Sequence, residues 1–440
     1  MRAFFCLNNR LQYYWKRYTI ISLDISQYLL SPCERDDFMI KNDITELFQP
    51  AHTLIGQGSI GEIPKFMNSA GVHRALVVTD KGLVKLGTVK LVTDVLDANS
   101  LPYTVYDSVE PNPSVRIVNE AFELFKSSGA DFLVAVGGGS PIDVSKAVSI
   151  LAANGGDIRD YCGVAKSSKP GAPIVAINTT AGTGSEVTRA YVVTDEEKKI
   201  KMVMVDNNCM AYLAIDDPDL MVGMPPSLTA ATGMDALTHA VEAFLCNVHT
   251  PFSDGAAIEA IRLVSKSLRR ATEYGRDINA RTDMCWAEYL AGLAFSNSGL
   301  GLVHAIAHQL GGMYHTPHGV ANAILLPFVM EFNLPYRTAR IARIGHAWFD
   351  DDTEGLTDVE AAKHAIDNIR RLSAAIGIPN LCDTPFNPKD IPLMAENALK
   401  DATAANNYVK ATKQDVEAIL MNAYTAGIAQ KVQAELKNFQ

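Results

Sequence analysis

The chain has 440 residues, of which 48% are hydrophobic and 20% are charged, and its formal net charge at pH 7 is −10. This length allows two domains of ordinary size, and the composition is that of a globular protein. The negative charge argues against a nucleic-acid partner, because contacts with phosphates require a basic face. No run of about 18 apolar residues is present, so we expect neither a transmembrane helix nor a membrane partner.

The seven cysteines are scattered along the chain, and no two of them form a CxxC pair. This pattern predicts neither a disulfide framework nor a zinc site built from thiolates. A reducing, cytoplasmic location fits it best.

The first 38 residues differ from the rest of the sequence. They are aromatic and basic, without a clean apolar run or a small-residue cleavage site, so they do not fit a secretory signal. Met39 opens a segment that resembles a protein start. We therefore expect residues 1–38 to be an extension outside the fold, and one version of this hypothesis is an upstream start codon. Mass spectrometry of the native N-terminus tests that version.

Residues 39–224 are predicted to form an α/β dinucleotide-binding domain. Apolar, β-rich runs alternate here with helical patterns such as that of residues 114–128. This rhythm is typical of parallel strands joined by crossover helices. Residues 191–206 instead resemble a hairpin. The remaining strands are expected at 74–80, 102–107, 131–140, 172–180 and 211–216.

A glycine-rich turn, VAVGGGSPID, follows the third of these runs. Gly138 and Gly139 allow the backbone to approach an anion closely, and Ser140 is expected to cap the next helix. Free amide groups at this turn could hold a pyrophosphate. The motif is neither GxGxxG nor a Walker P-loop, so a tight turn before a helix remains the alternative.

Two further features indicate a dinucleotide. The loop NTTAGTGSEVTR, residues 178–189, presents the hydroxyl groups of Thr179 and Thr180. Asp80 ends the first strand, where a carboxylate can accept hydrogen bonds from the adenosine ribose and so favours NAD over NADP. The alternative for Asp80 is a solvated turn residue.

Residues 225–440 are predicted to be all helical, since they are rich in Ala, Leu, Met and Glu and have few β-branched clusters. Eight helices are expected, at 228–246, 252–272, 279–297, 300–313, 319–332, 336–348, 358–376 and 413–437.

Five residues of this helical part predict a metal site. Asp235 and His239 are spaced i,i+4, as are His304 and His308, so each pair projects from one face of a helix; His318 lies in a Pro-His-Gly turn. One carboxylate and several imidazoles suit Fe²⁺ or Zn²⁺. Calcium and magnesium require more oxygen ligands than these segments supply.

The sequence resembles the iron-dependent (group III) alcohol dehydrogenases, the family that includes lactaldehyde reductase, 1,3-propanediol dehydrogenase and the bacterial methanol and butanol dehydrogenases. The resemblance covers roughly residues 48–437. It is carried by long motifs: GGGSPID, NTTAGTGSEVTR, DPDLMVGMPPSLTAATGMDALTHAVEA and LAFSNSGLGLVHAIAHQLGGMYHTPHGVANAILLP. The family often carries Asn-Pro-Arg near its C-terminus, where this chain has Asn406-Asn407-Tyr408.

This resemblance implies an α/β domain followed by a helical domain, with the active site between them, and a homodimer. It implies that His308 relays protons and that Phe295 lines the substrate pocket. The implied metal ligands are Asp235, His239, His304 and His318. The implied NAD contacts are Asp80, Asn112, Gly138, Gly139, Ser140, Thr179, Thr180, Lys201 and Leu220.

The implied activity is a metal-dependent alcohol dehydrogenase or aldehyde reductase. Hydride would pass between a small primary alcohol or diol and NAD, with the substrate oxygen on Fe²⁺; the residues leave Zn²⁺ open. Two alternatives remain: a relative with another reaction or metal, such as dehydroquinate synthase or the zinc-dependent glycerol dehydrogenase, and a cofactor-binding protein without turnover.

Overall fold

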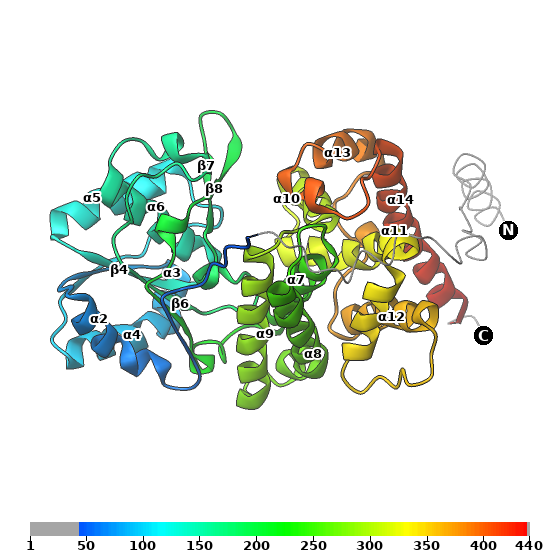
Figure 1. Ribbon diagram of the computed structural model, residues 1–440, viewed down its shortest axis with the longest axis horizontal. Coiled ribbons are helices and arrows are strands. Elements are labelled where there is room, and N and C mark those ends of the chain that lie inside the picture. Colours follow the sequence, from blue (N-terminus) through cyan, green and yellow to red (C-terminus); the bar gives the residue numbers. More distant parts are fainter. Residues whose placement is uncertain (1–43, 438–440) are drawn as a thin grey trace. The chain divides into compact units, whose positions relative to one another are not determined.

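The structure, a computed structural model, describes residues 44–437 (Figure 1). The expected extension at residues 1–38 lies outside the described part. Within that part, no helix combines the length and the apolar character needed to cross a bilayer.

The first half is built on a six-stranded parallel sheet in the order β1-β9-β6-β4-β2-β3. The two central strands, FLVAVG and IVAIN, are buried along their whole length. Their apolar runs are continuous because helices cover both faces of the sheet. The expected strands are confirmed, whereas the short edge strand β1 was not predicted. The strands are β1 (His52–Ile55), β2 (Ala75–Val78), β3 (Tyr103–Tyr106), β4 (Phe132–Gly137), β6 (Ile174–Asn178) and β9 (Leu213–Asp216).

Helices cover the two faces of this sheet, with α2 and α4 on one side and α5 and α6 on the other (Figure 1). Alternate residues of β2 divide accordingly: Val77 packs with the first pair and Leu76 with the second. The helices are α2 (Ile63–Ala70), α3 (Lys81–Leu86), α4 (Thr88–Ala98), α5 (Val115–Ser128) and α6 (Gly139–Asn154).

The strand order reverses between β2 and β4, and open parallel sheets have a crevice at the carboxyl ends of the strands at such a point. The chain leaves β2 for β3 on one side and then places β4 on the other side of β2. Open parallel sheets bind ligands at such a reversal. Asp80 follows β2 and Gly138 follows β4, so both border this crevice.

The predicted cap of α6 is wrong. The helix begins at Gly139, its N-cap is Gly138, and Ser140 lies in the first turn. The preceding Gly137 adopts a φ of 155°, which lets the chain turn early. Pro141 is tolerated inside the first turn because the amides there have no partner within the helix.

The expected hairpin is confirmed. β7 (Ala190–Asp195) pairs antiparallel with β8 (Ile200–Val205), and β5 (Gly163–Val164) adds to β8 in parallel. The short 3₁₀ helices are η3 (Ser59–Glu62), η4 (Ile158–Tyr161), η5 (Ser185–Val187), η6 (Asn207–Cys209), η7 (Pro218–Leu220), η8 (Leu381–Asp383), η9 (Pro388–Asp390) and η10 (Ala402–Asn406).

The second half is helical, as predicted. Its core helix α7 is buried on nearly every side, since its sequence is rich in alanine and other small residues. The helices are α7 (Pro226–Leu245), α8 (Pro251–Glu273), α9 (Ile278–Ser296), α10 (Leu302–Tyr314), α11 (His318–Ala347), α12 (Asp358–Ala375), α13 (Ile391–Ala398) and α14 (Lys413–Lys437).

Two details of the helical half differ from expectation. The helices expected at 319–332 and 336–348 form one element, α11, which is kinked at Arg337. Pro335 lies just before the kink and lacks an amide hydrogen, so the chain bends there without ending the helix. The short helix α13 was not predicted.

Candidate metal centre and cofactor crevice

Four predicted residues converge on one point in the helical half. Asp235 and His239 come from α7, His304 from α10, and His318 is the first residue of α11. One potential ligand atom from each lies within 4.8 Å of the other three. The first three side chains are buried, whereas that of His318 is 44% exposed. The centre is therefore open on the His318 side.

Hydrogen bonds orient two of these imidazoles. His239 Nδ1 lies 3.2 Å from the carbonyl oxygen of Gly182, and His304 Nδ1 lies 2.6 Å from Glu242 Oε2. Carbonyl and carboxylate oxygens accept, so Nδ1 carries the hydrogen in both rings. The lone pair on each Nε2 is then free for a metal.

Asn322 marks the point toward which the acceptor atoms turn. Its Nδ2 lies 2.7 Å from Asp235 Oδ1, 3.1 Å from His304 Nε2 and 3.2 Å from His318 Nε2. Three acceptors directed at one position in a buried site form an arrangement that a cation can fill.

The protonation states also suit a divalent metal. Burial lowers the pKa of His304 and of His318, so both rings are held neutral. Burial raises the pKa of Asp235, but the neighbouring imidazoles, His239 first, outweigh it and leave that pKa lowered. One carboxylate and three imidazoles are a donor set that fits Fe²⁺ and Zn²⁺.

Glu242 is a part of this site that the sequence analysis missed. Its Oε1 accepts from Val303 N at 2.6 Å, and its Oε2 accepts from Gly301 N at 2.9 Å as well as from His304. Burial raises the pKa of Glu242 to about 7, while the backbone donors oppose that shift. Glu242 follows His239 by three residues, so the i,i+3 spacing on α7 was the available signal.

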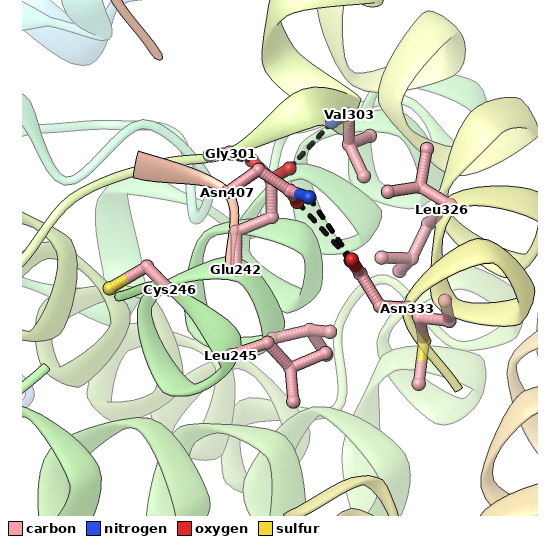
Figure 2. A pocket seen from close by; sticks show the side chains of 11 residues that line it. Glu242, Leu245, Cys246, Gly301, Val303, Leu326, Asn333 and Asn407 are labelled. Carbon is pink, nitrogen blue, oxygen red and sulfur yellow. Dashed lines mark hydrogen bonds between the residues drawn. The ribbon is translucent and has the colours of Figure 1, made fainter. Parts of the chain in front are cut away.

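The loop at residues 406–408, where the chain departs from the family pattern, borders the pocket that Glu242 lines. Figure 2 shows Asn407 and Asn333 lining the same pocket as Glu242. Asn407 Nδ2 donates to Asn333 Oδ1 at 3.0 Å, and Asn333 Nδ2 donates back at 3.2 Å. The Tyr408 ring lies 3.7 Å from the guanidinium carbon of Arg337. This loop therefore fixes the C-terminal segment to α11.

His308 lies one turn after His304 and at the open side of the centre. Its ring stacks on that of His318, with centroids 5.5 Å apart, and its side chain is 41% exposed. Its Nδ1 lies 2.8 Å from Asp401 Oδ2. Burial opposes ionisation of Asp401, but hydrogen bonds from His308 and Thr403 prevail and lower its pKa to about 2. Asp401 was also missed, because 93 residues separate it from His308.

Phe295, for which the resemblance implied a place in the substrate pocket, lies next to the metal centre. Its ring stacks on the His239 ring, with centroids 4.5 Å apart and an interplanar angle of 29°. The end of α9 thus contributes an apolar wall to the centre.

The glycine-rich turn and the threonine loop pack against each other at the crevice. A Cβ atom on Gly138 would lie 2.7 Å from Thr180 Oγ1, and one on Gly139 would lie 3.4 Å from Ser185 Oγ. Thr179 N donates to the carbonyl oxygen of Gly137 at 3.1 Å. Glycine is therefore required at Gly138, where any side chain would strike the second loop.

The structure shows the contacts of four other residues that were predicted to bind the cofactor. Asp80 caps α3 by accepting from Leu83 N at 3.0 Å, so the expected alternative of a solvated turn residue is too simple. Lys201 Nζ donates to Asn112 Oδ1 at 2.6 Å, and burial lowers the pKa of Lys201. Leu220 differs from the rest, because its side chain is packed in the apolar cluster under the sheet.

Comparison with known proteins agrees with this geometry. The family profile described as "Iron-containing alcohol dehydrogenase" matches residues 50–218, and that described as "Fe-containing alcohol dehydrogenase family, C-terminal" matches residues 229–424. Alcohol dehydrogenase 4 of Schizosaccharomyces pombe is 44% identical over 381 residues, which are 86% of this chain and 89% of that protein. The chain belongs to the iron-containing alcohol dehydrogenase family.

Two other members of the iron-containing alcohol dehydrogenases are similar over nearly their whole length. The NAD-dependent methanol dehydrogenase of Bacillus methanolicus is 41% identical over 86% of this chain and all of that protein. The crystal structure of 1,3-propanediol oxidoreductase aligns with a TM-score of 0.85 and 44% identity, over 87% of this chain and all of that one. The predicted family and fold are confirmed, and the chain is an oxidoreductase that acts on alcohols or aldehydes.

Proposed function

We propose that this chain interconverts small primary alcohols or diols and their aldehydes, with NAD as hydride carrier and Fe²⁺ as the metal. The observation that carries the proposal is the set of one carboxylate and three imidazoles whose ligand atoms lie within 4.8 Å of one another, three of the residues being buried and His318 exposed. The relative from Bacillus methanolicus, which is named as NAD-dependent, supports the choice of cofactor.

We assign the metal to Asp235, His239, His304 and His318. When bound, a divalent cation acts as a Lewis acid that makes the alcohol hydroxyl more acidic and the carbonyl more electrophilic. Glu242 holds the Nδ1 hydrogen of His304 and so keeps Nε2 available as a donor. Phe295 excludes water from the side of His239 on which it stacks.

His308 is assigned the transfer of the hydroxyl proton. Its Nδ1 hydrogen is held by Asp401, which leaves Nε2 to accept a proton on the open side of the centre. The nearby carboxylate also stabilises the imidazolium ion that forms when His308 accepts this proton. The exposed part of the ring can then return the proton to solvent.

The cofactor is assigned to the crevice between β2 and β4. Backbone amides at Gly138, Gly139 and Ser140 face the pyrophosphate at the start of α6. Asp80 accepts from the adenosine ribose, and Thr179 and Thr180 contact the nicotinamide half. The remaining assigned contacts are Asn112, Lys201 and Leu220. We divide the chain accordingly into residues 39–224 for the cofactor and 225–440 for the metal.

A substrate panel on anaerobically Fe²⁺-reconstituted protein tests this function. NADH formation or loss is followed at about 340 nm with ethanol, butanol, propanediols, glycerol and their aldehydes. We expect turnover with at least one pair, lost on chelation and restored by Fe²⁺. Turnover restored only by Zn²⁺ would refute the metal assignment, and NAD binding without turnover on any pair would refute the dehydrogenase.

The proposal includes a homodimer in the cytoplasm without a nucleic-acid or membrane partner. Sedimentation of the metal-loaded protein and fractionation of the source cells test these two points.

A further inference from the structure

A second cluster of ionisable groups lies where the cofactor half meets the helical half. Glu186 belongs to η5, Asp216 ends β9, and Glu288 comes from α9. Carboxyl oxygens of the three lie within 4.8 Å of one another, and all three residues are 0% exposed. The metal assignments do not use these residues.

The cluster has far fewer hydrogen-bond donors than acceptors. Glu288 Oε1 accepts from Asn178 Nδ2 at 2.7 Å and from Gly184 N at 2.6 Å. Within residues 44–437, Glu288 Oε2 and both carboxyl oxygens of Glu186 and of Asp216 find no donor. Ionised carboxylates without hydrogen-bond donors are strongly unfavourable in a protein interior. Either protonation of the carboxyl groups or a bound cation must therefore supply the missing donors or positive charge.

The groups around the cluster do not neutralise it. Lys146 of α6 faces Glu186, but its Nζ is engaged by the carbonyl oxygens of Ser185 at 2.7 Å, Thr188 at 2.8 Å and Ala190 at 2.8 Å. The other titratable groups that face the cluster are Asp143 across Lys146, Asp217 beside Asp216, and Cys285 and Tyr289 on α9. These carry a negative charge or none.

The surrounding packing disfavours a hydrated cation. A Cβ atom on Gly184 would lie 2.7 Å from Gly292 Cα, and one on Gly292 would lie 2.4 Å from Val187 Cγ2. The loop and α9 thus touch backbone to backbone. Hard cations usually need six or more oxygen ligands, often with water among them, and this contact leaves little space for water.

We propose that Glu186, Asp216 and Glu288 form a proton-binding site, which holds at least two protons at neutral pH and links loop 178–188 to α9 through hydrogen bonds between carboxyl groups. Each shared proton supplies a donor to an oxygen that otherwise has none. Lys146 can balance at most one negative charge. The three carboxyl groups and this lysine together are therefore neutral only when at least two of the carboxyl groups are protonated.

The site makes stability depend on pH in a defined direction. Burial raises the pKa of Glu186 to about 7, and burial together with the neighbouring carboxyl groups raises those of Asp216 and Glu288 well above their ordinary values. A group whose pKa is raised by folding stabilises the fold most below its unfolded pKa, about 4. That stabilisation is lost as the pH rises through the folded pKa, so the loop should loosen at alkaline pH.

Glu288→Gln tests the proposal in the metal-loaded full chain. The amide oxygen can keep both donors of Glu288, and the amide nitrogen can replace a shared proton. For the native chain we expect the unfolding constant to rise by up to about tenfold per pH unit for each proton that the folded chain holds and the unfolded chain has lost, from about pH 5 up to the folded pKa values. E288Q should lower this slope, whereas Glu123→Gln on α5, at a side chain that is 71% exposed, should leave it unchanged. Parallel pH curves for E288Q and the native chain would overturn the proposal.

Infrared spectroscopy provides a second readout, which a purely structural role would not move. We expect a carbonyl band of protonated carboxyl groups in the native chain at neutral pH, weakened in E288Q; E186Q is the second variant if E288Q does not fold. An unchanged band in a folded variant would contradict the proposal. So would elemental analysis that finds a second metal equivalent in the native chain and its loss in the variant.

Discussion

The metal centre and the carboxyl cluster both hold several ionisable groups close together inside the protein, but they do so with different side chains. Each gathers at least three ionisable groups inside the protein, and each joins elements that are distant in sequence. The metal centre has one acid among three imidazoles, two of which have an acceptor at the outer nitrogen, and one side is open to solvent. The carboxyl cluster has three acids and two donors in a closed space. The supply of donors and the access of water thus separate a metal site from a proton site.

Among the variants that test this comparison, removal of a proposed metal ligand should cause the largest loss of activity. Asp235→Ala deletes the only carboxylate among the proposed ligands and removes the oxygen acceptor of Asn322 Nδ2. We expect loss of the metal and a fall in kcat/KM of about 10³-fold or more, because several kcal/mol of electrophilic assistance disappears. Metal content and turnover measure this. His364→Ala, at a half-buried histidine outside the proposed ligand set, is the control and should keep both. Full metal content in D235A would contradict the ligand assignment.

His308→Ala should separate proton transfer from metal binding. We expect turnover to fall by roughly 10²–10⁴-fold while the metal stays bound, as for the loss of a general acid or base. Asp401→Asn should give a smaller loss, since it removes the orienting acceptor and keeps the ring. Steady-state rates with parallel metal analysis check both, again with His364→Ala as the control. A near-native rate for H308A at every pH would remove this role.

Glu242→Gln sharpens the contrast between the two clusters. The amide can keep one backbone donor but can no longer accept at both oxygens, so His304 loses its Nδ1 partner. We expect the affinity for Fe²⁺ to fall about 10–100-fold, the usual cost of losing an outer partner of a ligand. Metal titration of the apoprotein measures this; its thermal midpoint without metal should also fall, because Gly301 N and His304 Nδ1 lose a buried acceptor. E288Q is the matched variant: it should bind the metal normally and gain stability only at alkaline pH. If both variants behave alike, the two sites do not differ as proposed.

Asp80→Asn changes a half-buried carboxylate outside both clusters and should have the smallest effect. Asparagine keeps the cap on α3, so stability should stay within about 0.5 kcal/mol of native. Removing the charge should improve kcat/KM for NADP relative to NAD by roughly tenfold, because a 2′-phosphate no longer meets a negative group. The ratio of the two kcat/KM values is the measurement. An unchanged ratio would place the ribose elsewhere.

The residues of the metal centre could be predicted from the sequence, whereas those of the carboxyl cluster could not. Asp235, His239 and His304 lie on helices, where the i,i+4 spacing places side chains on one face. Glu242 had a weaker signal of the same kind. Glu186, Asp216 and Glu288 share no period and come from a loop, a strand end and a helix, so only the tertiary fold brings them together. The sequence also mispredicted Ser140 as the cap of α6, because the neighbouring glycines let the helix begin earlier.

One segment touches both clusters within three residues. The carbonyl oxygen of Gly182 meets the ring of His239, and the amide of Gly184 meets Glu288. The length of the peptide from Gly182 to Gly184 therefore sets the separation between the metal centre and the carboxyl cluster. Inserting or deleting one residue here would break both contacts together. Engineering for new alcohols should accordingly vary side chains near Phe295 and keep the length of this segment constant.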